Sequence, residues 1–144
     1  MFINQISIFL ENKPGALNAM TKVLAENNID LRAMFLAEAA EFGIVRIIVD
    51  NCYSASVLLR DAGYVCSITP VLGVQIPDAP GGLNEVLNDL TEANINIEYM
   101  YAFLGRKNAR HAYMIFRVND NGAATAALSA KGIKVLSPDA VCNL

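Results

Sequence analysis

Two short turns rich in proline and glycine offer the clearest chemistry in this sequence. The first is NKPGAL, from Asn12 to Leu17, and the second is DAPGGL, from Asp78 to Leu83. Each turn follows alternating apolar residues and precedes apolar residues at helical spacing, which places it between a strand and a helix. The first turn of a helix has backbone N–H groups without intrahelical acceptors and carries the positive end of the helix dipole. Each turn is therefore a candidate site for a carboxylate.

The same residues have a simpler interpretation as a tight connection. Proline restricts its own φ angle, and glycine adopts conformations that are closed to other residues and permits a second molecule to approach the backbone. Asn12 or Asp78 would then do no more than cap the following helix through its side chain. The sequence leaves both interpretations open.

The two turns belong to a longer internal repeat. Asn12–Met34 aligns without a gap on Asp78–Met100, an offset of sixty-six residues. The identical pairs are Pro14/Pro80, Gly15/Gly81, Leu17/Leu83, Asn18/Asn84, Leu24/Leu90, Glu26/Glu92, Asn28/Asn94, Ile29/Ile95 and Met34/Met100. Further on the offset becomes sixty-nine, which predicts three extra residues between Met100 and Ala112. A self-match of this length predicts one structural unit used twice, over residues 1–70 and 71–144.

The periodicities predict the same order of elements in each copy. In the first copy we expect strands at 3–10, 30–38, 44–49 and 64–67, and helices near 17–24 and 54–62. Gly63 and Gly132 are expected to end the second helix of each copy in a left-handed conformation. Ser67–Pro70 is expected to be a short linker. The order βαββαβ, twice, predicts an α+β protein of two tandem ferredoxin-like modules, each an antiparallel sheet with helices on one face.

Composition narrows the classes of partner. The net charge of −3 argues against nucleic acid, and no apolar stretch approaches the ~18 residues of a membrane span. The N-terminus does not have the pattern of a secretory signal, so we expect a cytoplasmic protein. Cys52, Cys66 and Cys142 show no metal-ligand spacing, and we expect neither a metal site nor a cofactor. The hydrophobic fraction of 54% in two units of marginal size predicts a buried interface, with a second copy or with an enzyme.

The repeated pattern D/N-x-P-G-x-L, followed by N-I-x-I/L, resembles the ACT domain, a regulatory module that binds amino acids. The resemblance covers essentially the whole chain as NKPGAL with NIDL and DAPGGL with NINI. It implies a non-catalytic sensor that binds a free amino acid where two modules meet and passes the signal to a metabolic enzyme or regulator. The implied ligand-binding residues are Asn12, Pro14, Gly15, Ala16 and Leu17, then Asp78, Pro80, Gly81, Gly82 and Leu83, with Asn28, Ile29, Asn94 and Ile95 as a supporting wall.

The two implied sites differ from each other and from the usual family pattern. Asn12 stands where an acidic residue is more usual, and Ala79 stands where a basic residue is often found. Asp78 carries a full charge, and Gly82 is expected to admit closer approach than Ala16. We therefore expect the second turn to make the tighter contact with the amino acid.

Three alternatives remain. RNA binding would use Tyr113 and Phe116, but an odd spacing does not place them on one face of a strand. Catalysis would pair His111 with a cysteine, yet His111 lies in a cationic segment with Arg106, Lys107 and Arg110, and no phosphate-binding glycine motif is present. The third alternative is a regulatory or structural subunit that docks on an enzyme and binds no small ligand.

Overall fold

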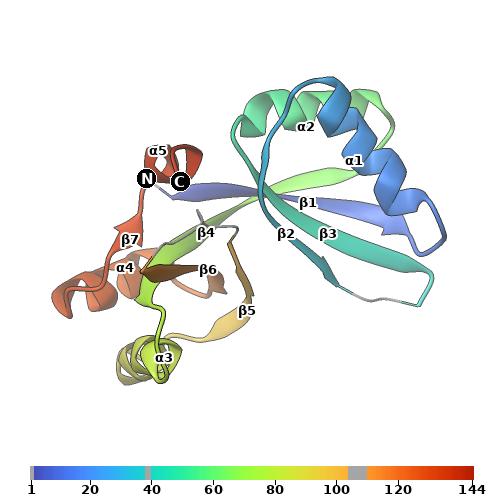
Figure 1. Cartoon of the computed structure of the whole chain (residues 1–144). Helices are drawn as coiled ribbons and strands as arrows, with labels where there is room; N and C mark the ends of the chain where they lie inside the picture. Colours follow the sequence, from blue (N-terminus) through green and yellow to red (C-terminus); the bar gives the residue numbers. More distant parts are fainter. Residues whose placement is uncertain (1, 38–39, 104–109) are drawn as a thin grey trace. The chain divides into compact units, whose positions relative to one another are not determined.

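The computed structural model describes residues 2–37, 40–103 and 110–144 of the chain. Contacts between residues group them into two compact units, Asn4–Thr69 and Met1–Ile3 with Pro70–Leu144, which we call module 1 and module 2. The repeat predicted a division after residue 70. Figure 1 shows the order of the elements along the chain.

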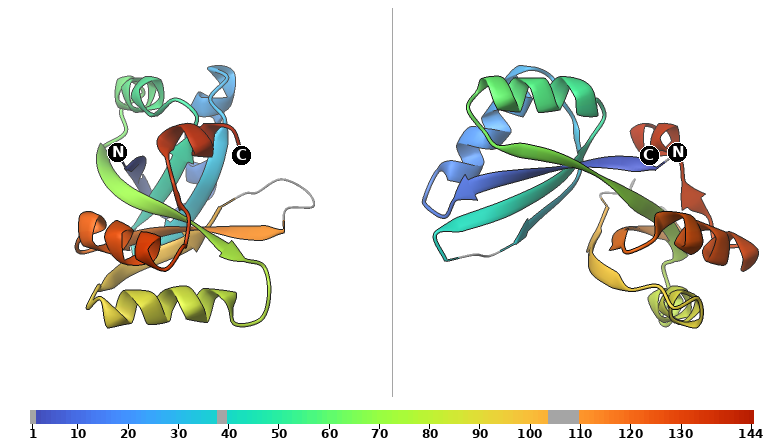
Figure 2. Two further views of the ribbon diagram at one scale, coloured as in Figure 1. Left: turned by 90° about the vertical axis from the view of Figure 1, so that its left-hand side faces the viewer. Right: turned by 180° about the vertical axis from the view of Figure 1, so that it is seen from behind.

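Module 1 is an antiparallel sheet with two helices on one face (Figures 1 and 2). Its elements are β1 (Ile3–Glu11), α1 (Ala16–Glu26), β2 (Leu31–Ala37), β3 (Phe42–Val49), α2 (Cys52–Asp61) and the first residues of β4 (Cys66–Pro77). β3 pairs with both β1 and β2, and Val45 lies opposite Ile8 on one side and Leu36 on the other. β2 is therefore the edge strand of this pairing.

Module 2 repeats this order. It contains the rest of β4, then α3 (Gly82–Glu92), β5 (Ile97–Ala102), β6 (His111–Val118), α4 (Asn121–Ala130), β7 (Val135–Leu136) and α5 (Pro138–Cys142). β4 pairs with β6 and β7, and β5 pairs with β6, all antiparallel. The bounds of α1 and α3 differ by sixty-six residues, and those of α2 and α4 differ by sixty-nine. The starts of β2 and β5 also differ by sixty-six and those of β3 and β6 by sixty-nine, so the offset changes between β5 and β6. The two βαββαβ modules and their ferredoxin-like class are confirmed.

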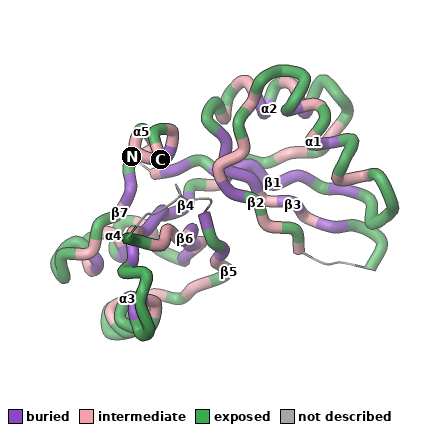
Figure 3. The backbone as a smooth tube through the Cα atoms, viewed as in Figure 1, coloured by how far each residue is buried: buried purple, intermediate pink, exposed green. Residues whose placement is uncertain are grey.

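Each module has its own apolar core, built from equivalent positions. The buried residues of module 1 are Ile6, Ile8, Leu10, Met20, Leu24, Val45, Ile47, Val49, Ala55 and Leu59. Those of module 2 are Leu72, Val74, Ile76, Val86, Leu90, Phe116, Val118, Ala124 and Leu128. Figure 3 shows the buried residues concentrated along the strands, and the buried residues of α1 and α3 recur at helical spacing. The alternating and helical patterns of the sequence arise because each strand and helix buries one face.

The structure corrects two expectations about local structure. The predicted linker at Ser67–Pro70 is wrong, because β4 runs without a break from Cys66 to Pro77. Pro70 lacks an N–H, but its carbonyl oxygen still accepts hydrogen bonds from Arg117 Nη1 at 3.5 Å and Asn121 Nδ2 at 3.2 Å. The sequence patterns also did not predict α5, in which Ser137 Oγ accepts a hydrogen bond from the Ala140 N–H at 3.2 Å and Pro138 is the first helical residue.

Two further details concern the ends of helices and of the described ranges. Gly63 and Gly132 have φ angles of 93° and 76°, which confirms their predicted left-handed conformation after α2 and α4. Glu38, the expected end of a strand, and Arg106 and Lys107, the expected cationic segment, lie outside the described residues. No helix in the described ranges has the length and apolar content needed to cross a bilayer.

Candidate functional site

The two proline–glycine turns leave the N-termini of α1 and α3 without a side-chain cap. Gly15 and Gly81 are the N-cap residues, with φ angles of 84° and 87°, and no side-chain hydrogen bond caps either helix. By contrast, side chains cap the other three helices: Asn51 caps α2, Asp120 caps α4 and Ser137 caps α5. The interpretation of Asn12 and Asp78 as simple side-chain caps is therefore wrong. The Ala16 and Gly82 N–H groups donate to the Lys13 and Ala79 carbonyl oxygens at 3.3 and 3.0 Å, so the N–H groups of the next two residues of each helix are the candidates to bind an anion.

Both turns use the same backbone arrangement. The Asn12 N–H donates to the Glu41 carbonyl oxygen at 2.8 Å, and the Asp78 N–H donates to the equivalent oxygen of Arg110 at 3.4 Å. The Gly15 carbonyl oxygen accepts from Ala19 N–H at 2.9 Å, and the Gly81 oxygen accepts from the Glu85 N–H at 3.0 Å. The turns therefore differ in their surroundings more than in their backbone.

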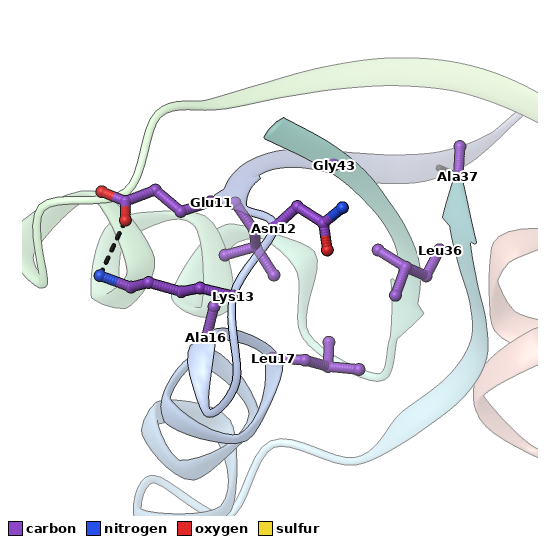
Figure 4. A pocket seen from close by; sticks show the side chains of 9 residues that line it. Glu11, Asn12, Lys13, Ala16, Leu17, Leu36, Ala37 and Gly43 are labelled. Carbon is purple, nitrogen blue, oxygen red and sulfur yellow. Dashed lines mark ion pairs between the residues drawn. The ribbon is translucent and has the colours of Figure 1, made fainter. Parts of the chain in front are cut away.

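In module 1 the turn borders a cavity of about 210 Å³. The lining residues are Leu10, Glu11, Asn12, Lys13, Ala16, Leu17, Leu36, Ala37 and Gly43. Figure 4 shows the Asn12 amide and the side chains of Leu17 and Leu36 directed toward a common space. A cavity of ~150 Å³ already holds a benzene molecule, so this one has room for a small organic ligand.

The charged residues of this cavity neutralise each other. Glu11 Oε2 and Lys13 Nζ are 2.7 Å apart, and both side chains are largely exposed. The hydrogen bond and the charge of Glu11 raise the pKa of Lys13, because they favour its protonated form. In Figure 4 this pair lies on the side of the turn away from Leu36. Figure 4 shows the Asn12 side-chain amide toward the apolar walls, and its Nδ2 donates to the Ala40 carbonyl oxygen at 3.5 Å.

A second hollow of about 590 Å³ borders the same turn and shares Leu10, Glu11, Lys13 and Ala16 with the first. It includes Phe9, Phe42 and Val65, which are among the exposed apolar residues of the chain, together with Pro14 and Gly15. The equivalent residues of module 2 are Gln75, His111 and Lys134. The backbone confirms this equivalence, because the Phe9 N–H donates to Val65 O at 3.1 Å and the Gln75 N–H to Lys134 O at 3.0 Å. The first turn therefore lies in apolar surroundings and the second in polar ones.

Gly82 has a role in the packing of the chain. A Cβ atom at this position would collide with the Pro77 carbonyl oxygen, and Gly82 is buried. The absence of a side chain thus makes room for the chain itself. This packing accounts for the glycine without a ligand, and the closer approach of a ligand to Gly82 stays a prediction.

The structure separates four of the predicted site residues from the turns. Asn28 and Asn94 follow α1 and α3 with φ angles of 55° and 57°, a conformation that asparagine adopts more readily than most residues. The N–H groups of Ile29 and Ile95 donate to Leu24 O and Leu90 O at 3.0 and 2.9 Å, and both isoleucines pack on their module cores. These residues lie at the opposite end of an 11-residue helix, about 16 Å along its axis. Conversely, six residues that line the cavity were not predicted: Leu10, Glu11, Lys13, Leu36, Ala37 and Gly43.

This separation leads to a prediction for Asn28. Asn28→Val should lower the free energy of unfolding by about 1–2 kcal/mol, because a β-branched residue is strained at φ 55°, whereas Asn28→Gly should cost much less. Urea unfolding measures both changes. If Asn28 instead formed the wall of a ligand site, Asn28→Gly would weaken amino-acid binding, and we expect that binding to be unchanged.

The catalytic and RNA-binding alternatives find no support in the described residues. Burial raises the pKa values of the Cys52 and Cys66 thiols, which is the opposite of what a nucleophilic cysteine requires. Phe116 is 0% exposed and Tyr113 packs edge-on against Phe103 at a ring distance of 6.3 Å, so Phe116 cannot stack on an RNA base. No group of three or more His, Cys, Asp or Glu residues in the described ranges is arranged to hold a metal.

Comparisons with known proteins agree with the repeat and the fold. Residues 1–142 match the family profile described as an ACT domain pair. The chain is 38% identical to protein BT0572 from Bacteroides thetaiotaomicron, with a TM-score of 0.93 and coverage of 100% of this chain and 98% of that one. It is also similar to the ligand-free regulatory subunit of aspartate kinase from Thermus thermophilus, with 18% identity, a TM-score of 0.70 and coverage of 92% of each chain. For the regulatory subunit of aspartate kinase from Thermus flavus, the identity is 14%, the TM-score is 0.63, and the match covers 90% of this chain and 92% of that one. Comparison with curated proteins gives no match. The matched profile spans almost the whole chain, and the chain therefore belongs to the ACT domain family, as a pair of ACT domains in tandem.

Proposed function

We propose that this chain is a non-catalytic regulator that binds a free α-amino acid at the Asn12–Leu17 turn and passes the signal to a metabolic enzyme or regulator. The observation that carries the proposal is the uncapped N-terminus of α1 beside a cavity with apolar walls. Membership of a family of regulatory modules supports the regulatory part of the proposal. The apolar surroundings of the first turn lead us to choose module 1 for the ligand, in place of the second turn that the sequence favoured.

The turn offers partners for both charges of an amino acid. The ligand carboxylate would accept hydrogen bonds from the N–H groups of Leu17 and Asn18 in the first turn of α1, and charge-assisted bonds of this kind contribute about 1.5–3 kcal/mol each. The ligand ammonium would donate to the amide oxygen of Asn12 and to nearby backbone carbonyl groups. Binding at a junction of two modules, as the family resemblance implies, stays a prediction.

Such binding regulates through the populations of conformations. A ligand shifts an equilibrium between two arrangements only by the difference between its affinities for them. A regulated enzyme or a second copy of the chain that recognises one arrangement would therefore sense the amino acid indirectly.

A thermal-shift experiment with all twenty amino acids tests the proposed function. Ligand that binds only the folded state raises its stability by RT ln(1 + [L]/Kd), so one amino acid or a related group should raise Tm in a concentration-dependent way. An unchanged Tm across the whole series, up to millimolar concentrations, would contradict the proposal.

One observation favours the second candidate, a subunit that docks on another protein. The large apolar side chains found exposed in the described residues all lie in module 1: Phe9, Met34, Leu36, Phe42, Tyr53, Val57, Val65 and Ile68. Their equivalents in module 2 are Gln75, Met100, Ala102, His111, Gly122, Ala126, Lys134 and Ser137. Apart from Met100, which matches Met34, each of them is smaller or more polar than its counterpart. The fold itself therefore does not require these exposed residues. Three of them, Phe9, Phe42 and Val65, line one hollow, and an exposed apolar patch of this kind is typical of interaction sites.

Exchanging residues between the modules tests this second candidate. The triple variant Phe9→Gln, Phe42→His and Val65→Lys should fold, because module 2 carries these residues at the same backbone positions. We expect it to lose self-association or partner binding, since the variant removes apolar area from the interface. Light scattering at micromolar concentration and co-purification measure the loss. An unchanged oligomeric state and an unchanged set of partners would show that this surface is not an interface.

A further inference from the structure

The walls of the module 1 cavity restrict which amino acid it can accept. Resting on the proposed function, we infer that this cavity selects an amino acid with an uncharged, aliphatic side chain. The inference depends on the lining residues, on their charges and on the comparison with module 2.

The first observation is the apolar character of the walls. Leu10, Ala16, Leu17, Leu36 and Ala37 contribute them, from β1, α1 and β2. Leu36 is 51% exposed although it faces the same side of the sheet as the buried Val45, because β2 is an edge strand. An aliphatic ligand side chain between Leu17 and Leu36 removes apolar surface of both residues from water (Figure 4).

The second observation is the balance of charges. Among the described residues that line the cavity, the acid is Glu11 and the base is Lys13, and they pair with each other at 2.7 Å. A carboxylate or ammonium on the ligand side chain would lose water contacts without gaining an opposite charge, unless it broke this pair. The cavity therefore disfavours aspartate, glutamate, lysine and arginine as ligands.

The third observation is that module 2 lacks the same walls. Leu36 and Gly43 of module 1 correspond to Ala102 and Ala112 of module 2. A Cβ atom on Gly43 would lie 3.3 Å from Leu36 Cδ1, so the glycine leaves room for the larger leucine. The two modules thus fill this region in different ways, and the aliphatic selectivity belongs to module 1.

Isothermal titration with the full chain tests the selectivity. Leucine, valine and methionine should bind at least tenfold more tightly than glutamate, lysine and serine. Leu36→Ala, which introduces the module 2 residue, should weaken leucine binding about five- to tenfold, and Leu36→Asp should abolish it. Ala102→Asp places the same charge at the equivalent, exposed position of module 2 and should leave leucine binding unchanged.

The outcomes separate the selectivity from the proposed function. If glutamate, lysine or serine binds most tightly and the Leu36 variants retain that affinity, the selectivity is wrong while amino-acid binding stands. If no amino acid binds the unmodified chain, the proposed function fails and the selectivity fails with it. If leucine binds but Leu36→Asp and Ala102→Asp have equal effects, the module 1 cavity is not the site.

Discussion

Replacing Ala16 by leucine is expected to abolish amino-acid binding, with a loss of at least 100-fold in affinity, or about 2.7 kcal/mol. Ala16 is the first residue of α1 and lines both hollows beside the turn. Three added carbon atoms would occupy the space of the ligand next to the N–H groups that we assign to its carboxylate. Because leucine is a good helix former, the helix itself should persist.

Ala25→Leu is the matched control for this variant. Ala25 is exposed near the end of the same helix and lines neither hollow beside the turn. Isothermal titration should give an unchanged affinity for Ala25→Leu and no detectable binding for Ala16→Leu. Equal affinities in both variants would exclude the Asn12–Leu17 turn as the binding site.

The largest effect on stability is expected from Leu24→Ala and Leu90→Ala. These equivalent residues are 1% exposed and belong to the cores of module 1 and module 2. Each substitution removes buried methyl groups and leaves a cavity, which costs about 2–5 kcal/mol in the free energy of unfolding. Urea unfolding, monitored by circular dichroism, measures the loss.

Leu36→Ala serves as the control for this pair, since Leu36 is half-exposed and its truncation should change the unfolding free energy far less than either core substitution. A cost below about 1 kcal/mol for one of the two core leucines would contradict the equivalence of the modules that the repeat implies.

The repeat made most of the fold predictable. The gap-free match placed α1 and α3, and the change of offset placed the extra residues between β5 and β6. These elements can be predicted from short stretches of sequence, because the spacing of apolar residues within one helix or strand indicates which face it buries. The continuous strand through Pro70 was not predictable in this way, since a strand is defined by pairing with β1, β6 and β7, which lie far away in the sequence.

The candidate site was predictable only in part. The turn and its uncapped helix follow from proline and glycine at known positions. Because both copies have an asparagine at this position, Asn28 and Asn94 were expected to form a wall of the ligand site. The structure explains the two asparagines by the backbone, since each has a positive φ angle just after a helix. An asparagine directly after a helical pattern is itself a signal for this conformation.

Leu36 shows why the cavity walls escaped sequence analysis. An alternating apolar residue in a strand predicts burial, and only the position of β2 at the sheet edge leaves Leu36 exposed. A difference between the copies did carry the information, because Leu36 aligns with Ala102, Phe9 with Gln75 and Val65 with Lys134. Positions at which two copies of one fold differ are therefore as informative about function as the positions that they share.

The central claim, that a free amino acid binds at the first turn, is tested most directly by amide NMR of the ¹⁵N-labelled chain titrated with leucine and then with the other amino acids. We predict saturable shifts of the backbone N–H signals of Ala16, Leu17 and Asn18 and of the Asn12 side-chain amide. The Asn28 and Ile29 signals at the far end of α1 should shift much less. Absence of any saturable shift across the series, or shifts confined to residues outside the Asn12–Asn18 segment, would contradict the claim.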